Sequence, residues 1–258
     1  MIGAWVALAD AVRPELRGLL LASLRVLPLA LLCPLLGGRL APAPVRLAVA
    51  PTIALAMRPL AGAVPVAGVD FWAGCLREAG LGLLAGMAAA LPFDAARIGG
   101  RMVDLVRGTS AEAALPVAGH RESATADALH QLLLALALAG GGLPAMVRAI
   151  GRSYLLLPPG SPAVGRGSAA ALAGLVGTAL ATGLSVAAPV VALSWATDAA
   201  VALALRVAPG LGLGEIATPV RILGGAAILW LSLGVAADRL MAALLGPDPG
   251  WLGAVLRP

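Results

Sequence analysis

Stretches without a charged residue constrain this chain more than any other feature. A helix that crosses the hydrocarbon of a bilayer needs about 20 apolar residues. The uncharged run 167–197 exceeds this length, and the run 128–147 just reaches it. Four further runs fall short of it: 26–38, 47–57, 79–93 and 222–237. Because lipid offers no hydrogen-bond partners and strongly disfavours charge, short helices bounded by charged residues are expected to need other protein around them.

The composition agrees with a chain whose main solvent is not water. Of the 258 residues, 60% are hydrophobic and 12% are charged, against about 25% charged in an average soluble domain. Prolines lie inside or beside nearly every apolar segment, where each removes a backbone donor and favours a kink. We therefore predict an all-α, polytopic membrane protein of kinked helical hairpins, one domain over residues 1–258. About six hydrophobic helical segments are expected, at 19–36, 44–57, 70–107, 125–150, 168–206 and 219–245.

The same sequence disfavours several classes of function. The net charge is +5, but the 18 basic residues are all Arg and stand singly, with few aromatic residues among them, so no nucleic-acid partner is expected. Cys33 and Cys75 are isolated in apolar surroundings and are predicted to be small core residues, with no metal site and no cofactor. His120 and His130 are predicted at the surface or at helix ends. The chain contains no HExxH, GxSxG or Walker motif, so neither a catalytic residue nor an enzyme activity is predicted.

Polar residues within the apolar segments are the candidates for a functional role. Glu78 stands just before the run AGLGLLAG, and an intramembrane carboxylate is expected to pair with an Arg or to face an aqueous cavity. Gly82 and Gly86 form a GxxxG spacing, which either marks a helix-packing face or arises by chance in an Ala- and Gly-rich chain. A polar stripe, either solvated or packed against partners, is predicted on one helical face by the spacing of Asp94, Arg97, Arg101 and Asp104.

Five segments in a fixed order resemble a known family. The most specific is IGGRMVDLVRGTSAEAALP, in which Asp104, Arg107 and Gly108 form an Asp-x-x-Arg-Gly motif. The others are LRVLPLALLCPLLGGRLAPAPVRLAVA, REAGLGLLAGMAAALPF, GGGLPAMVRAIGRSYLLLPPG and AAPVVALSWATDAAVALALRVAP. Over about residues 20–245 this order resembles the FliR/YscT/SpaR/HrcT family, the large polytopic subunit of the type III export apparatus. The Asp-x-x-Arg-Gly motif resembles the injectisome branch more than the flagellar branch.

The resemblance implies a structural subunit of an inner-membrane export gate that forms part of the channel for unfolded secreted proteins. It implies two smaller polytopic gate subunits as partners, FliP/YscR-like and FliQ/YscS-like, together with an FlhB/YscU-like switch protein, substrates in transit and membrane lipid. The alternative is a secondary transporter, which would be expected to show repeat symmetry, and the sequence has no visible internal repeat. Arg residues are shared equally between alternate loops, so the membrane orientation stays open.

Two groups of residues are predicted to carry this function. The segment Gly108–Ser123 is rich in small residues, so it cannot span lipid but can fill a narrow lumen. The resemblance places it at the pore constriction, and it is predicted to be a plug loop, with a surface loop as the alternative. Its predicted site residues are Gly108, Thr109, Ser110, Pro116 and Gly119. The predicted intramembrane polar and partner-packing residues are Arg25, Glu78, Asp104, Arg107, Asp198, Arg206 and Pro209.

Overall fold

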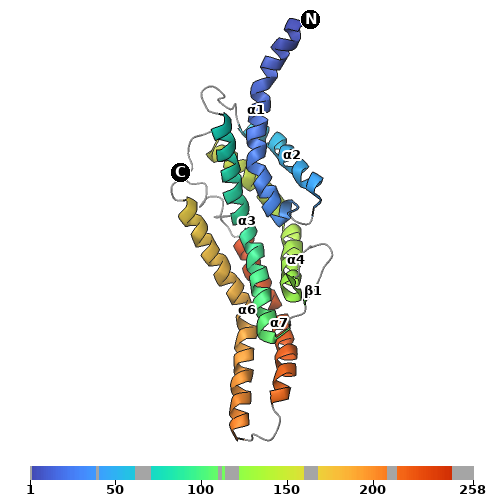
Figure 1. Ribbon diagram of the computed structural model, residues 1–258, viewed down its shortest axis with the longest axis vertical. Helices are drawn as coiled ribbons and strands as arrows, with labels where there is room; N and C mark the ends of the chain where they lie inside the picture. Colours follow the sequence, from blue (N-terminus) through green and yellow to red (C-terminus); the bar gives the residue numbers. More distant parts are fainter. Residues whose placement is uncertain are drawn as a thin grey trace. The chain divides into compact units, whose positions relative to one another are not determined.

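The described residues of the computed structural model are almost entirely helical (Figure 1). The description covers residues 2–38, 41–61, 71–109, 112–113, 122–159, 168–207 and 214–245. Its elements are α1 (Ile2–Leu32), the 3₁₀ turn η1 (Pro34–Leu36), α2 (Ala43–Ala61), α3 (Phe71–Arg107), α4 (Ala124–Ala139), α5 (Gly142–Leu156), α6 (Ser168–Val207) and α7 (Gly214–Leu245). Two short antiparallel strands, β1 (Glu112–Ala113) and β2 (Glu122–Ser123), pair between α3 and α4. The predicted all-α fold class is confirmed.

The structure corrects two of the predicted helices. The first helix begins at Ile2, well before the predicted start at residue 19. The predicted helix 125–150 is two helices, α4 and α5, which meet at an angle of 74°. Gly141 lies at the break with a φ of +78°, a left-handed conformation that glycine adopts without steric cost. The sharp bend thus comes from glycine, whereas α3 and α6 each continue as one helix through Pro92 and Pro189.

Within the part of the chain that the structure describes, three helices are long and apolar enough to cross a membrane, namely α3, α6 over residues 170–207 and α7 over residues 217–244. The bent α4–α5 pair would make a fourth span. Each of the six predicted hydrophobic segments overlaps described helices, and these provide three candidate spans, or four with the bent pair. Each of these helices contains an apolar window of 18 residues, of which 56% is buried in α3, 28% in α6 and 11% in α7. The described residues therefore leave most of this apolar window uncovered in α6 and α7.

Packing contacts divide the chain into two compact units. The first contains residues 1–90, 137–176 and 245–258, and the second contains residues 91–136 and 177–244. Helix α3 contributes its first part to one unit and its last part to the other. The prediction of a single domain over residues 1–258 stays a prediction.

In the first unit, α1 and α3 cross at the predicted GxxxG spacing. A side chain at Gly82 would overlap the backbone of Arg25, and one at Gly86 would meet the Cα atom of Leu29 at 3.0 Å. The contacts advance together along both helices, so α1 and α3 run in the same direction (Figure 1). Small residues allow such close approach of two helix backbones. The interpretation of Gly82 and Gly86 as a packing face is confirmed.

In the second unit, the last part of α3 packs against α6 and α7. The fully buried centre consists of Val103 from α3 with Ala187 and Val190 from α6. Gly99 and Gly183 allow α3 and α6 to approach closely, since a side chain at Gly99 would lie 2.9 Å from the carbonyl oxygen of Gly183. This packing fixes the end of α3, where Asp104 and Arg107 lie.

Candidate functional site

The predicted residues Arg25 and Glu78 form a buried ion pair in the first unit. Arg25 comes from α1 and Glu78 from α3, and 4% and 2% of their side chains are exposed. The guanidinium donates from Nε to Oε2 of Glu78 at 2.6 Å and from Nη2 to Oε1 at 3.1 Å. This two-pronged arrangement is the geometry in which Arg and a carboxylate bind most strongly. Of the two alternatives predicted for Glu78, pairing with an Arg and facing an aqueous cavity, the structure shows the pairing.

Helix α5 completes this network. Nη1 of Arg25 donates to the backbone carbonyl of Ser153 at 3.0 Å, and the guanidinium carbon lies 4.7 Å from the centre of the Tyr154 ring. The Tyr154 hydroxyl donates in turn to the carbonyl of Ala22 at 2.7 Å. A cation is favoured near the carbonyls that end a helix, and Ser153 lies in the last turn of α5. The single guanidinium of Arg25 thus joins α1, α3 and α5.

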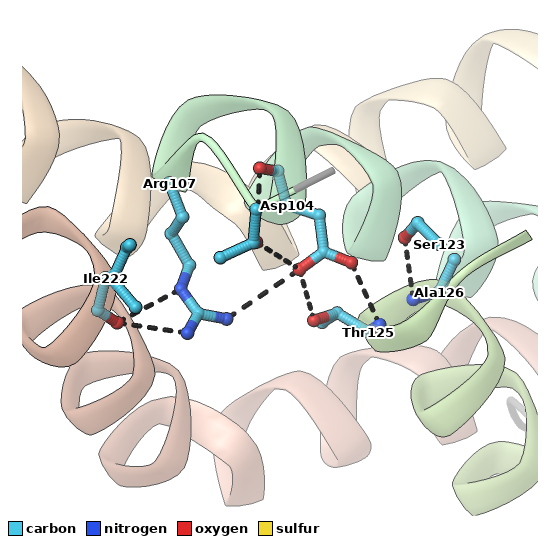
Figure 2. A network of polar contacts seen from close by, with 7 residues as sticks. Asp104, Arg107, Ser123, Thr125, Ala126 and Ile222 are labelled. Atoms are coloured by element: carbon cyan, nitrogen blue, oxygen red, sulfur yellow. Dashed lines mark hydrogen bonds and ion pairs between the residues drawn. The ribbon is translucent and has the colours of Figure 1, made fainter. Parts of the chain in front are cut away.

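A second network surrounds Asp104 at the end of α3 (Figure 2). Oδ2 of Asp104 accepts the backbone N–H of Thr125 at 3.0 Å, and Oδ1 accepts the Thr125 hydroxyl. Oδ1 also accepts the Thr109 hydroxyl at 3.2 Å. The hydroxyl of Ser123, the residue just before α4, accepts the N–H of Ala126 at 3.2 Å, so Ser123 and Asp104 together satisfy two donors that the start of a helix leaves free. We call Asp104, Thr109 and Thr125 the loop-base clamp.

Arg107 connects the loop-base clamp to α7. Its Nη1 lies 3.7 Å from Oδ1 of Asp104, while Nε and Nη2 donate to the carbonyl of Ile222 at 3.2 and 3.0 Å (Figure 2). Gly225, one turn further along α7, makes room for the Arg107 side chain, because an added Cβ would lie 2.8 Å from Cγ of Arg107. Asp104 and Arg107, which the sequence predicted as polar packing residues, therefore share one network in the second unit.

Asp198, Arg206 and Gly108, the other predicted site residues that the structure describes, do not join these networks. Asp198 in α6 forms an ion pair with Arg221 in α7 at 2.7 Å, where both side chains are partly exposed. Arg206 is exposed in the last turn of α6. Gly108 is exposed and has a φ of +73°, as expected for a turn that leaves a helix. Four predicted residues lie outside the described residues: Ser110, Pro116, Gly119 and Pro209.

Two sequence interpretations need correction. The residues of the predicted polar stripe on α3 do not all lie in the same environment, since Asp94 and Arg101 are exposed whereas Asp104 is buried. His130, predicted at the surface or a helix end, is buried within α4, where its ring meets the Phe93 ring edge-on at 5.7 Å. Cys33 is buried, in agreement with its predicted place in the core, whereas Cys75, predicted there too, is only partly buried.

Sequence reasoning missed the partners that complete both networks. Thr125 and the Ile222 carbonyl are brought to Asp104 and Arg107 only by tertiary packing, and their sequence spacing gives no signal of it. Gly100 carried a partial signal, because it lies one turn before Asp104 and a side chain there would overlap the backbone of Ala126. A glycine beside a charged helix end could have indicated close approach of another element.

Comparison with known proteins identifies a family match over most of the chain. No curated protein matches it. The sequence profile described as "Bacterial export proteins, family 1" matches residues 16–245, which includes both ionic networks and all four candidate spans. This match does not favour the alternative of a secondary transporter, and the injectisome branch stays a prediction. The chain therefore belongs to this family of bacterial export proteins, the FliR/YscT/HrcT component of the type III export apparatus, and is a membrane protein of that apparatus.

Proposed function

We propose that the chain is a structural, multi-pass subunit of the inner-membrane export gate and forms part of the channel for unfolded proteins. The observation that carries this proposal is the family match over residues 16–245, in a chain that leaves long apolar helices uncovered. The role is structural and requires neither a catalytic residue nor a cofactor. The chain positions helices, and the energy for transport comes from other components.

The uncovered helices support a role within a larger assembly. Large apolar side chains on α6 and α7 are more than two-thirds exposed, among them Trp195, Leu223, Trp230 and Leu231. The partly exposed ion pair of Asp198 and Arg221 lies across the same two helices, and charged groups are unfavourable against lipid. This combination favours protein neighbours over lipid along part of the surface. The proposed neighbours are the FliP/YscR-like and FliQ/YscS-like subunits, with the FlhB/YscU-like switch protein beside them.

The experiment that tests assembly is co-purification with the two smaller subunits from the inner membrane. Leu231→Asp places a charge on the uncovered face of α7, and it is expected to abolish co-purification. Leu231→Met keeps an apolar side chain at the same position and should co-purify like the wild type. Resistance to alkaline carbonate extraction shows separately whether each variant is inserted. If inserted Leu231→Asp still co-purifies fully, α7 does not pack against these subunits.

We further propose that the segment Gly108–Ser123 is the plug loop of the resting gate. The closure of its base supports this role, because Asp104 binds Thr109 on one side of the segment and Thr125 just beyond the other. The strands β1 and β2 pair the same two sides. A segment held at its base can remain in one place while its tip changes position.

Deletion of residues 115–119 tests the plug loop and keeps the loop-base clamp. The deletion leaves residues 114, 120 and 121 to connect β1 and β2, so the pairing of the strands can be retained. The complex is expected to assemble and to leak ions in the absence of secretion. Wild-type conductance of an assembled deletion variant would show that the segment is not the plug.

A further inference from the structure

Arg107 lies between α7 and the loop-base clamp and contacts both. Two of its nitrogens are bound to the Ile222 carbonyl of α7, and the third faces Asp104 at 3.7 Å. Only 13% of the Arg107 side chain and 7% of the Asp104 side chain are exposed. In such surroundings the electrostatic attraction between the two groups is weakly screened.

The carboxylate of Asp104 is in turn the acceptor for the first turn of α4. It accepts both the backbone N–H and the hydroxyl of Thr125, and it accepts the hydroxyl of Thr109. If Arg107 moves, the carboxylate loses its counter-charge and can rotate away from these donors. The state of α4's first turn therefore depends on a contact made by α7.

We propose that Arg107 and Asp104 form a coupling element, through which the position of α7 controls the closure of the loop-base clamp. The coupling element has two states. In one, the Arg107 side chain packs against Gly225 and its guanidinium binds the Ile222 carbonyl; in the other, it has left both. Helix α7 is less covered than α3 and α6, so a partner can pack on it, and the resulting shift of α7 would change the hydrogen bonds of Thr109 and Thr125. That a partner packs on α7 rests on the proposed function, whereas the coupling between α7 and the loop-base clamp does not.

Gly225 offers a way to move Arg107 without removing a charge. A Cβ at this position would lie 2.8 Å from Cγ and 3.0 Å from Cδ of Arg107, so Gly225→Ala must shift that side chain. Gly234 is the matched control on the same helix, because a Cβ there meets nothing within 4 Å. Both substitutions raise the helix propensity of α7 equally, so a difference between them reports the contact with Arg107.

The test is hydrogen exchange of the Thr125 amide, measured in the purified export-gate complex in detergent. Gly225→Ala and Arg107→Met should each speed this exchange about tenfold, because a hydrogen bond to a charged group is weakened. Gly234→Ala should leave it unchanged. In an Asp104→Asn background the exchange should already be fast, and Gly225→Ala should add little further.

Unchanged Thr125 exchange in both Gly225→Ala and Arg107→Met would overturn the coupling. Equal acceleration by Gly234→Ala would also overturn it, because the effect would then be a general property of α7. Failure of the proposed function would be seen differently, as loss of co-purification with the smaller subunits. The exchange comparison between Gly225→Ala and Gly234→Ala can then be repeated on the chain in detergent without them, where the coupling predicts the same difference.

Discussion

Replacement of Glu78 by Ala removes one partner of the buried ion pair and leaves the other in place. Arg25 would lose two charge-assisted hydrogen bonds, at 2.6 and 3.1 Å. Its guanidinium would stay in a buried position, since only 4% of the side chain is exposed. Breaking a buried pair in this way typically costs about 3–5 kcal/mol, because an uncompensated charge remains inside. The Ser153 carbonyl and the Tyr154 ring still contact the guanidinium, so we expect the lower end of this range, about 3 kcal/mol.

Glu78→Gln should be milder, because the amide oxygen can still accept one hydrogen bond from Arg25. The double variant Arg25→Leu with Glu78→Leu should be more stable than Glu78→Ala, since no charge is left unpaired. Arg77→Ala is the matched control, because it removes a charge from the adjacent, exposed position of α3.

The assay is reversible unfolding of the detergent-solubilised complex in a denaturing detergent, followed by Trp fluorescence. The free energy of unfolding of Glu78→Ala is compared with that of Arg77→Ala. A difference below about 0.5 kcal/mol, the range of ordinary surface substitutions, would refute the structural role of the pair.

Three further outcomes follow from the described contacts. Gly82→Ala should destabilise the crossing of α1 and α3 by about 1–3 kcal/mol, because the added Cβ overlaps the Arg25 backbone. Gly80→Ala is its control in the same unfolding assay: a Cβ there meets nothing within 4 Å, so the change should be neutral or slightly stabilising. Tyr154→Phe removes the hydrogen bond to a buried backbone carbonyl and should lower the unfolding free energy by about 0.5–1.5 kcal/mol. Asp198→Asn should change it by less than about 1 kcal/mol, because the ion pair is partly exposed, and a loss of several kcal/mol would contradict this.

The sequence allowed the bounds of α3 and α6 to be predicted because their ends coincide with changes in composition. The predicted segment 168–206 differs from α6 by one residue, and 70–107 differs from α3 by one residue. The break between α4 and α5 was missed because the glycines lie inside an uncharged run, which reads as one apolar segment. Gly140 and Gly141 separate the two helices, Gly141 with a left-handed backbone, and a backbone angle is not visible in a hydropathy pattern.

The candidate site was predictable in part. A carboxylate within an apolar segment must find a partner, so the pairing of Glu78 followed from the cost of burying a charge. Its partner Arg25 lies 53 positions away, and that distance is bridged by the helix crossing at Gly82. The interaction of Asp104 with the first turn of α4 could not be predicted, because it depends on where a second helix begins in space.

Crosslinking to a stalled substrate tests most directly the proposal that this chain forms part of the channel for unfolded secreted proteins. The direct measurement places a photoreactive residue at position 110, in the proposed plug loop, and stalls a substrate in the complex by fusing it to a stably folded domain. The same residue at Trp230, exposed on the outside of α7, serves as the control position. We predict that light crosslinks position 110 to the stalled substrate, and position 230 to a partner subunit. A stalled substrate that crosslinks to neither the plug loop nor any other position of this chain, while it crosslinks to other gate subunits, would show that this chain does not form part of the channel.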